Sequence, residues 1–235
     1  MTKSSDFHLT TFPSGTAIHL LLDLDGTLTD PKLGIVTCIR HALGELGVKI
    51  DPAIRLESFI GPPLRDTFRS LCGENSNAEH IEAAVALYRE RFSSLGLYEN
   101  QVYDGIPQCL QTLRDHVDSI HLATSKPAVY ARRIVDHFGL DQYLDGVYGS
   151  ELDGRLGDKT ELLEHILTKE KLNPANTVMV GDRSFDVIGA HNNQMQVIGV
   201  LWGYGSQEEL ERAGADFLCH HPAEIHTTLL STTFR

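Results

Sequence analysis

Two carboxylates stand close together at the end of a short apolar run near the N-terminus. Residues 17–22 (AIHLLL) can form a strand buried between two layers of helices, and Asp23 and Asp25 follow directly. Residues at i and i+2 of a strand point to the same side, so both carboxylates can face the crevice where open α/β sheets bind ligands. Two like charges repel at that distance, and a cation or a shared proton would relieve the repulsion. A divalent ion with oxygen ligands, such as Mg²⁺, is the simplest solution.

A second acidic pair follows the run 177–180 (TVMV). Asp182 comes at the expected strand end, and Asp186 lies four residues on, on the same face of the helix that should begin there. Acids in the first turn of a helix are also favoured by the helix dipole alone. An acid at the end of each of two buried strands, however, is what a shared metal ion needs. The pattern therefore indicates that Asp23 and Asp182 meet at one edge of a sheet.

Hydroxyls and a lysine follow two further segments. Thr124 and Ser125 come after the expected strand 119–123, where they can donate to a phosphate or simply cap the next helix. Lys159 follows a loop rich in Gly and Asp, at the point where a helix should start. A lysine there is either an ordinary surface residue or a fixed ammonium that neutralises a phosphate and a carboxylate together.

The elements that would position these residues follow two patterns. Residues 32–97 carry apolar stripes at helical spacing and no confident strand, whereas strands and helices alternate from about residue 104 onward. One of the later helices should open at Ser206 with a capping box completed by Glu209. After the first strand at 17–23, the expected strands are 119–123, 146–149, 177–180, 197–200 and 216–219. This alternation predicts an α/β fold with a doubly wound parallel sheet.

The helical stretch interrupts the alternation just after the first strand. We therefore expect a catalytic α/β core formed by residues 1–31 and 98–235, with residues 32–97 as an inserted helical cap domain. Residues 1–16 are polar and contain Pro13 and Gly15, so we expect a loose arm there.

The composition of the 235-residue chain is that of an ordinary globular protein, with 41% apolar residues. A net charge of −12 argues against a nucleic acid polymer as partner and requires local cations for any anionic substrate. The four cysteines have neither zinc-site nor disulfide-framework spacing. The N-terminus lacks the apolar core of a signal peptide, and no apolar run reaches the ~18 residues of a membrane span. We expect a cytoplasmic monomer or homodimer with no membrane partner.

In order and character, the segments that carry these residues resemble the four motifs of the haloacid dehalogenase superfamily of phosphatases. Segment 23–28 (DLDGTL) resembles the first motif and 181–186 (GDRSFD) the fourth, while Thr124 and Lys159 fall at the second and third. The resemblance covers about residues 18–220. It implies a sheet of order 5-4-1-2-3 with strand one central.

Two short segments narrow the resemblance within the superfamily. The turn 60–64 (IGPPL) and the tail 200–205 (VLWGYG) are similar to those of phosphoglycolate phosphatase-like and bacterial 5'-nucleotidase-like members. The helical stretch between the first and second motifs resembles the first type of cap in that superfamily.

The resemblance also implies a role for each matching acid. Asp23 would be the nucleophile that forms an aspartyl-phosphate, and Asp25 would protonate the leaving oxygen and later activate water. Asp23, Asp182 and the backbone carbonyl of Asp25 would hold Mg²⁺, with Asp186 in support. Superfamily dehalogenases lack an acid at the position of Asp25, and transport ATPases carry Thr there, so this residue favours phosphatase or phosphomutase chemistry.

Thr124, Ser125 and Lys159 would bind the phosphoryl oxygens. Many relatives have a proline after the lysine of the third motif, and this chain does not, so Lys126 is the alternative for that role. Arg65 follows a stiff bend made by two prolines and is expected to contact the leaving group. The alternative is an exposed arginine that covers apolar surface with its stem.

The function that we expect is Mg²⁺-dependent hydrolysis of a small phosphorylated metabolite, such as phosphoglycolate or a nucleoside monophosphate. A sugar phosphomutase of the same superfamily would share every core residue and differ in the cap. A response-regulator-like binding domain also places acids, a Thr and a Lys at strand ends. Such a domain is usually near half this length and has no helical insert, so residues 32–97 argue against it.

Overall fold

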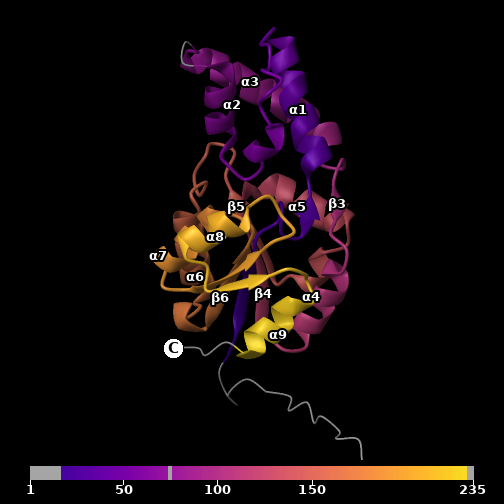
Figure 1. The fold of residues 1–235 in the computed structure, drawn as a ribbon. Coiled ribbons are helices and arrows are strands. Elements are labelled where there is room, and N and C mark those ends of the chain that lie inside the picture. Colours follow the sequence, from indigo (N-terminus) through magenta and orange to yellow (C-terminus); the bar gives the residue numbers. More distant parts are fainter. Residues whose placement is uncertain (1–16, 74–75, 232–235) are drawn as a thin grey trace, which may run out of the picture.

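The computed structural model describes residues 17–73 and 76–231, and the expected arm at 1–16 lies outside them. Figure 1 shows two regions: a sheet with helices on both sides, and a group of helices beyond one end of that sheet. Among the described residues, no helix combines the length and apolar character needed to cross a membrane.

The larger region contains a six-stranded parallel sheet. Its strands are β1 (His19–Leu22), β4 (Ser119–Pro127), β5 (Gly146–Ser150), β6 (Thr177–Gly181), β7 (Gln196–Val200) and β8 (Phe217–Cys219). They lie in the order β5-β4-β1-β6-β7-β8. Counted among these strands alone and read from β7 to β5, this is the order 5-4-1-2-3, and β8 extends the sheet beyond β7. The predicted doubly wound parallel sheet is confirmed.

The central strands are aligned so that their carboxyl ends meet. Leu22 of β1 is level with Leu122 of β4 and with Val180 of β6. The backbone N–H of Asp23 continues this ladder and donates to the carbonyl oxygen of Val180 at 2.9 Å. Side chains at the carboxyl ends of β1, β4 and β6 therefore emerge at one edge of the sheet, at the point where the strand order reverses and α/β proteins bind ligands.

Helices cover both faces of the sheet, and alternate residues of β1 accordingly pack into two different apolar clusters. Leu20 and Leu22 pack in the cluster that contains Ile106 and Ile134, whereas Leu21 packs with Val187 on the opposite face. Figure 1 accordingly shows α6 and α7 on one side and α4 and α9 on the other. The helices of this region are α4 (Ile106–Arg114), α5 (Ala128–His137), α6 (Lys159–Glu170), α7 (Ser184–Asn192), α8 (Gln207–Ala213) and α9 (Glu224–Ser231), with short turns η3 (Asp141–Tyr143) and η4 (Pro174–Asn176).

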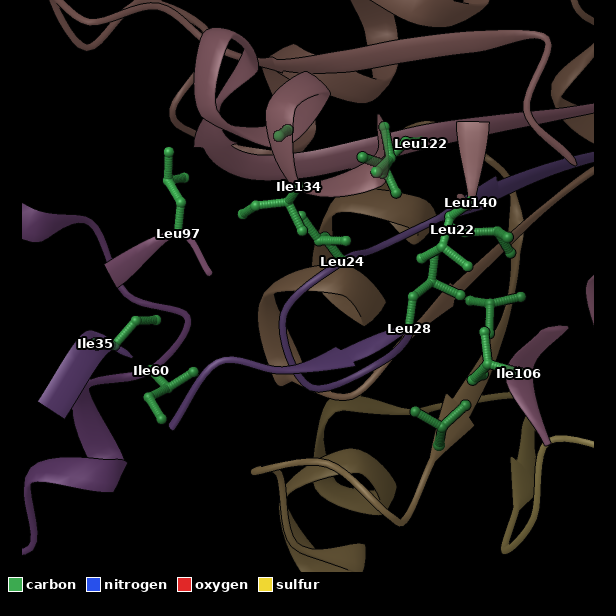
Figure 2. Close-up of a cluster of buried hydrophobic side chains, with 14 of the residues drawn as sticks. Leu22, Leu24, Leu28, Ile35, Ile60, Leu97, Ile106, Leu122, Ile134 and Leu140 are labelled. Atoms are coloured by element: carbon green, nitrogen blue, oxygen red, sulfur yellow. The ribbon is translucent and has the colours of Figure 1, made fainter. Parts of the chain in front are cut away.

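The second region, residues 32–97, is called the helical insertion here. Its described elements are α1 (Lys32–Glu45), η1 (Leu56–Phe59), α2 (Leu64–Cys72), α3 (Ala78–Arg91) and the π-helical turn η2 (Phe92–Gly96). The stripe of α1 that we predicted from its spacing is buried. Figure 2 shows Ile35, Ile60 and Leu97 in the same apolar cluster as Leu24 and Leu28, which follow β1. The insertion thus shares a continuous apolar core with the sheet region.

A short antiparallel ribbon joins the two regions, and nothing in the sequence pattern indicates it. β2 (Thr29–Asp30) pairs with β3 (Gln101–Val102), with Thr29 opposite Val102. The ribbon therefore holds the chain segments that enter and leave the helical insertion next to each other. Two-residue strands carry no periodicity, and their pairing depends on where the helices bring the chain back.

Candidate active site

Three buried carboxylates meet where β1 and β6 end. Asp23, Asp182 and Asp186 each offer an oxygen, and these oxygens lie within 4.8 Å of one another. Gly26 lets the turn after β1 approach this cluster: its φ is +87°, and a Cβ there would lie 2.2 Å from Oδ2 of Asp182. A residue with a side chain would therefore push the acids apart.

Asp182 is only partly satisfied by the protein. Its Oδ2 accepts a hydrogen bond from the backbone N–H of Tyr204 at 2.7 Å, whereas its buried Oδ1 has no hydrogen-bond partner among the described residues. Burial raises the pKa of Asp182 well above its ordinary value, and repulsion from Asp186 and Asp23 adds to the rise. An orphaned oxygen among three carboxylates fits a hard divalent cation, which takes carboxylate oxygens as ligands.

Lys159 supplies a buried positive charge to the same cluster. Its Nζ lies 2.7 Å from Oδ1 of Asp186 and 3.1 Å from Oδ1 of Asp23, and it donates to the carbonyl oxygen of Ala123 at 2.8 Å. Burial alone would lower the pKa of Lys159, but Asp186 and Asp23 outweigh it and hold that pKa above its ordinary value. Asp158 caps α6 by accepting from the backbone of the first turn, so the helix starts where its first side chain reaches the acids.

Lys126 contacts the other acid of the first pair. Its Nζ lies 2.7 Å from Oδ2 of Asp25, and both side chains are nearly buried. Burial raises the pKa of Asp25, although Lys126 opposes that rise. The two lysines that we considered for one role are therefore divided between two acids, with Lys159 against Asp23 and Lys126 against Asp25.

The strand predicted at 119–123 extends further, because β4 runs to Pro127, so the predicted hydroxyls lie within its last residues and not after it. Thr124 is buried, and its Oγ1 accepts from the backbone N–H of Lys126 at 3.2 Å. Ser125 is half-buried and lines the same cavity as Asp23. Both residues therefore lie where they would contact a phosphoryl group bound next to the acids.

Asp186 and its neighbours shape the start of α7. The Oδ2 of Asp186 accepts from the backbone N–H of Arg183 at 3.1 Å, while Glu209 accepts from the Nε of Arg183 and from the backbone and hydroxyl of Ser184. Our predicted capping box at Ser206 is accordingly only half formed: Ser206 accepts from the backbone of Glu209, but the Glu209 carboxylate is turned toward α7. The Glu209 carboxylate pairs with the guanidinium of Arg183 instead of accepting from the backbone of Ser206, because a charged hydrogen bond is the stronger contact.

A cavity of about 580 Å³ lies over these residues, between the sheet region and the helical insertion. Of the polar residues described above, seven line this cavity and are called its floor: Asp23, Asp25, Asp186, Lys126, Lys159, Thr124 and Ser125. Its apolar and aromatic wall comes chiefly from the insertion and includes Ile35, Ile39, Phe59, Val85, Tyr88 and Phe92. Cationic side chains stand around it: Arg65, Arg69, Arg89 and Arg183.

Hydrogen bonds from two arginines connect the insertion to the sheet region beside this cavity. The guanidinium of Arg183 donates to the carbonyl oxygen of Ile60, and Arg89 donates to the carbonyl oxygen of Leu152 at 2.8 Å. Arg65, which we expected to contact the leaving group, lines the cavity but is paired with Glu82 through its Nε at 2.5 Å and its Nη2 at 3.0 Å. Its role in substrate binding stays a prediction.

Sequence reasoning missed several residues of this cavity. Arg183 lies inside the segment 181–186 that we singled out, yet only its acids were considered. Tyr88 and Phe92 belong to an apolar helical stripe, a pattern typical of core residues. Only the folded arrangement shows that this stripe also faces the acids.

A doubly wound sheet that gathers paired acids, buried lysines and hydroxyls at the carboxyl ends of its central strands defines an α/β enzyme of the phosphotransfer type. The chain belongs to the haloacid dehalogenase-like hydrolases, whose family model matches residues 20–200. It is accordingly a hydrolase of phosphoric monoesters.

Individual relatives are similar over most of the chain. It is 43% identical over 213 residues to a 5'-nucleotidase from Pseudomonas aeruginosa, and the aligned region covers 91% of this chain and 96% of the relative. It is 36% identical to the tyrosine-protein kinase PtkA of Mycobacterium tuberculosis, over 86% of this chain and 68% of the relative. Among solved structures, a predicted phosphatase from Clostridium acetobutylicum superposes with a TM-score of 0.86 at 37% identity, covering 92% of this chain and 99% of that one.

Proposed function

We propose that this chain is a Mg²⁺-dependent phosphatase that hydrolyses a small phosphomonoester through an aspartyl-phosphate on Asp23. One observation carries the proposal. Asp23 lies at the end of β1 with one oxygen against the buried ammonium of Lys159, among carboxylates that need a cation. A carboxylate held in this way can act as a nucleophile toward phosphorus, because its surroundings offset both its own charge and that of the substrate.

The floor residues would hold the phosphoryl group before attack. Thr124 and Ser125 would donate to its oxygens, and Lys159 would neutralise part of its charge. Asp23, Asp182, Asp186 and the backbone carbonyl of Asp25 would hold Mg²⁺, which when bound screens the repulsion between Asp23 and the anionic substrate.

The chemistry then proceeds in two displacements. An oxygen of Asp23 attacks phosphorus, the bond from phosphorus to the leaving oxygen breaks, and Asp25 gives its proton to that oxygen. In the second displacement, Asp25 takes a proton from a water molecule, which attacks phosphorus, releases inorganic phosphate and regenerates Asp23. Burial of Asp25 raises its pKa, which favours the proton-bearing form that the first displacement needs.

The helical insertion would act as a cap that selects the leaving group, with residues 1–31 and 98–235 as the catalytic core. The acids, lysines and hydroxyls of the floor can bind only the phosphoryl group, so they cannot tell one monophosphate from another. A cavity of about 580 Å³ is within the ~300–1,000 Å³ typical of small-molecule sites, and its aromatic wall suits a leaving group larger than glycolate. A nucleoside is a fitting occupant, in line with the name of the 43% identical relative.

A sugar phosphomutase remains the alternative, because it would use the same floor. The two functions differ in product: a phosphatase releases inorganic phosphate at each turnover, whereas a mutase returns the phosphoryl group to the sugar. No contact among the described residues of the cavity favours the mutase specifically.

A phosphate-release screen tests the proposal. The substrates are nucleoside monophosphates, phosphoglycolate, sugar phosphates and p-nitrophenyl phosphate, each with Mg²⁺ and with chelator. We expect Mg²⁺-dependent release, strongest with a nucleoside monophosphate. We also expect a phosphoenzyme that survives an acid quench and that Asp23→Asn abolishes. Absence of phosphate release from the whole panel, or labelling that survives Asp23→Asn, would refute the assignment.

A further inference from the structure

We propose that Lys126 is a positioning residue for the proton transfer by Asp25, and that Phe92 of the helical insertion holds Lys126 in place. This inference rests on the proposed function, because it assigns a partner to the residue that protonates the leaving group. The motif resemblance offered Lys126 only as the alternative to Lys159 for binding the phosphoryl group.

The two oxygens of Asp25 have different surroundings. Oδ2 lies 2.7 Å from Nζ of Lys126, with side-chain exposures of 6% for Lys126 and 11% for Asp25. Oδ1 is buried and has no hydrogen-bond partner among the described residues. Anchoring one oxygen fixes the rotation of the carboxylate, and the other oxygen is left free for a proton that must travel to the leaving group. An acid catalyst needs this combination, because small errors in its orientation reduce the rate sharply.

Lys126 is held from both of its ends. Its backbone N–H donates to Oγ1 of Thr124 at 3.2 Å, and the strand register shifts between Thr124 and Pro127, which redirects the chain at this point. Its Nζ lies 4.6 Å from the centre of the Phe92 ring, so the ammonium stands between an aromatic face and the carboxylate of Asp25.

The ring of Phe92 is itself fixed by other aromatic residues. It stacks on Tyr88 with ring centres 5.2 Å apart, and Tyr130 of α5 meets it edge-on at 5.5 Å. Phe92 belongs to the helical insertion, whereas Lys126 and Asp25 belong to the sheet region. The ring can therefore support the ammonium only while the insertion is docked, and docking of the insertion is thereby linked to the orientation of Asp25.

The division between the two lysines makes this role testable. Lys159 contacts Asp23 and Asp186, so its loss should slow reaction with every substrate. Lys126 contacts Asp25, so its loss should matter only where the leaving oxygen needs a proton. Alkoxide leaving groups need that proton, whereas p-nitrophenolate leaves readily without it.

The experiment compares kcat/KM for glycerol 2-phosphate and p-nitrophenyl phosphate in the full-length chain, because kcat/KM reports the first displacement. For Lys126→Ala we expect a loss on the order of 10²-fold with glycerol 2-phosphate, a typical contribution of acid–base catalysis, and less than about tenfold with p-nitrophenyl phosphate. Asp25→Asn should show the same contrast, and the double variant should be no slower than Asp25→Asn. Lys126→Arg should restore part of the loss, because it retains the cation.

The matched control is Lys169→Ala. The Nζ of Lys169 lies 4.7 Å from the ring centre of Tyr148, so it makes a similar cation–ring contact on an exposed side chain outside the cavity. Both constants should be unchanged. Phe92→Leu, which keeps apolar volume without an aromatic face, should reproduce the substrate contrast more weakly, at about two- to tenfold.

Equal losses of Lys126→Ala on both substrates would overturn the inference, since Lys126 would then bind the phosphoryl group or support the fold. A double variant slower than Asp25→Asn by the full Lys126 effect would overturn it as well. If Asp25→Asn itself shows no contrast between the substrates, the assignment of Asp25 in the proposed function fails, which is a separate result.

Discussion

The floor of the cavity and the helical insertion hold their charges in opposite ways. In the floor, Lys159 and Asp186 form an ion pair whose side chains are 4% and 2% exposed, placed by strand ends and a helix start. In the insertion, Arg65 and Glu82 pair while 36% and 53% exposed. A buried pair is costly to break because each charge is left unpaired in a poor solvent, whereas an exposed pair contributes only ~0–1 kcal/mol. The buried pair of the floor is therefore harder to rearrange than the exposed pair of the insertion.

This contrast separates chemistry from selection. Under the proposed function, the floor would present the same atoms to every phosphoryl group, so a rigid arrangement would serve it. The insertion would meet leaving groups that differ, and side chains with solvent as an alternative partner could rearrange around them. Substitutions in the two regions should consequently differ in both size and kind of effect.

The largest effect is expected from Asp23→Asn. Removing the proposed nucleophile should lower phosphate release by about 10³-fold or more. The free energy of unfolding should change little, because the weakened contact with Lys159 is offset by relief of the repulsion from Asp182 and Asp186, and Lys159 keeps Asp186 as a partner. Steady-state assays and thermal melts check the two halves. More than a trace of activity in a pure sample would contradict the nucleophile assignment.

Lys159→Met tests the rigid side of the comparison. It leaves Asp23 and Asp186 without their buried cation, so we expect a loss of ~3–5 kcal/mol in the free energy of unfolding, together with loss of activity. The control is Lys32→Met, whose ion pair with Glu57 is exposed, at a cost of less than about 1 kcal/mol. Urea titrations measure both values, and similar losses in the two variants would remove the contrast.

Asp182→Asn should raise the free energy of unfolding, whereas Lys159→Met lowers it. Burial and two neighbouring acids disfavour its charge, while an Asn oxygen can still accept from the backbone of Tyr204. Without metal ion, we expect the free energy of unfolding to rise by ~1–3 kcal/mol, and Mg²⁺ should no longer stabilise the protein or support activity. Melts with chelator and with Mg²⁺ test this. An unstabilised variant that still responds to Mg²⁺ would refute the proposed ligand set.

Arg183→Met tests the connection between the regions. It removes the donor to Ile60 and the partner of Glu209, so the insertion should dock less firmly. We expect kcat/KM to fall by a factor equivalent to ~1–2 kcal/mol of transition-state stabilisation, chiefly through a higher KM. The residues of the floor should stay in place. Arg212→Met is the control, because its pair with Glu208 is largely exposed. An unchanged KM would show that this contact does not hold the cap over the substrate.

The smallest effect is expected from Arg65→Ala. A charged hydrogen bond from Arg65 to the leaving group would contribute ~1.5–3 kcal/mol. Arg65 must leave Glu82 to make that contact, which lowers the expected loss in kcat/KM to ~1 kcal/mol for a nucleoside monophosphate. Acetyl phosphate, which is too small to reach the insertion, should lose nothing. Equal losses on both substrates would place the effect on the phosphoryl group or the fold.

The parts of the molecule that could be predicted are those that local sequence specifies. Strand β1 and the acids after it follow from an apolar run and a spacing of two, and the order of the sheet followed from the family resemblance. The parts that escaped prediction depend on segments far apart in the chain. The pairing of Lys126 with Asp25 exists because β1 and β4 are neighbours in the sheet, and the reach of Arg183 to Ile60 exists because the sheet region and the insertion meet. The capping box at Ser206 formed only in part, because the Glu209 carboxylate pairs with Arg183, a residue far away in the sequence.

The ribbon of β2 and β3 also bears on how the chain folds. β1 must pair with β4, and His19 and Ser119 in these strands are 100 residues apart in the sequence. Bringing together two ends of a long flexible segment costs entropy, and contacts between distant residues slow folding. Because Thr29 lies opposite Val102, a helical insertion that folds locally and closes this ribbon delivers the end of β1 close to the start of the segment that leads into β4. The segment that interrupts the sheet in sequence thereby shortens the search that the sheet has to make.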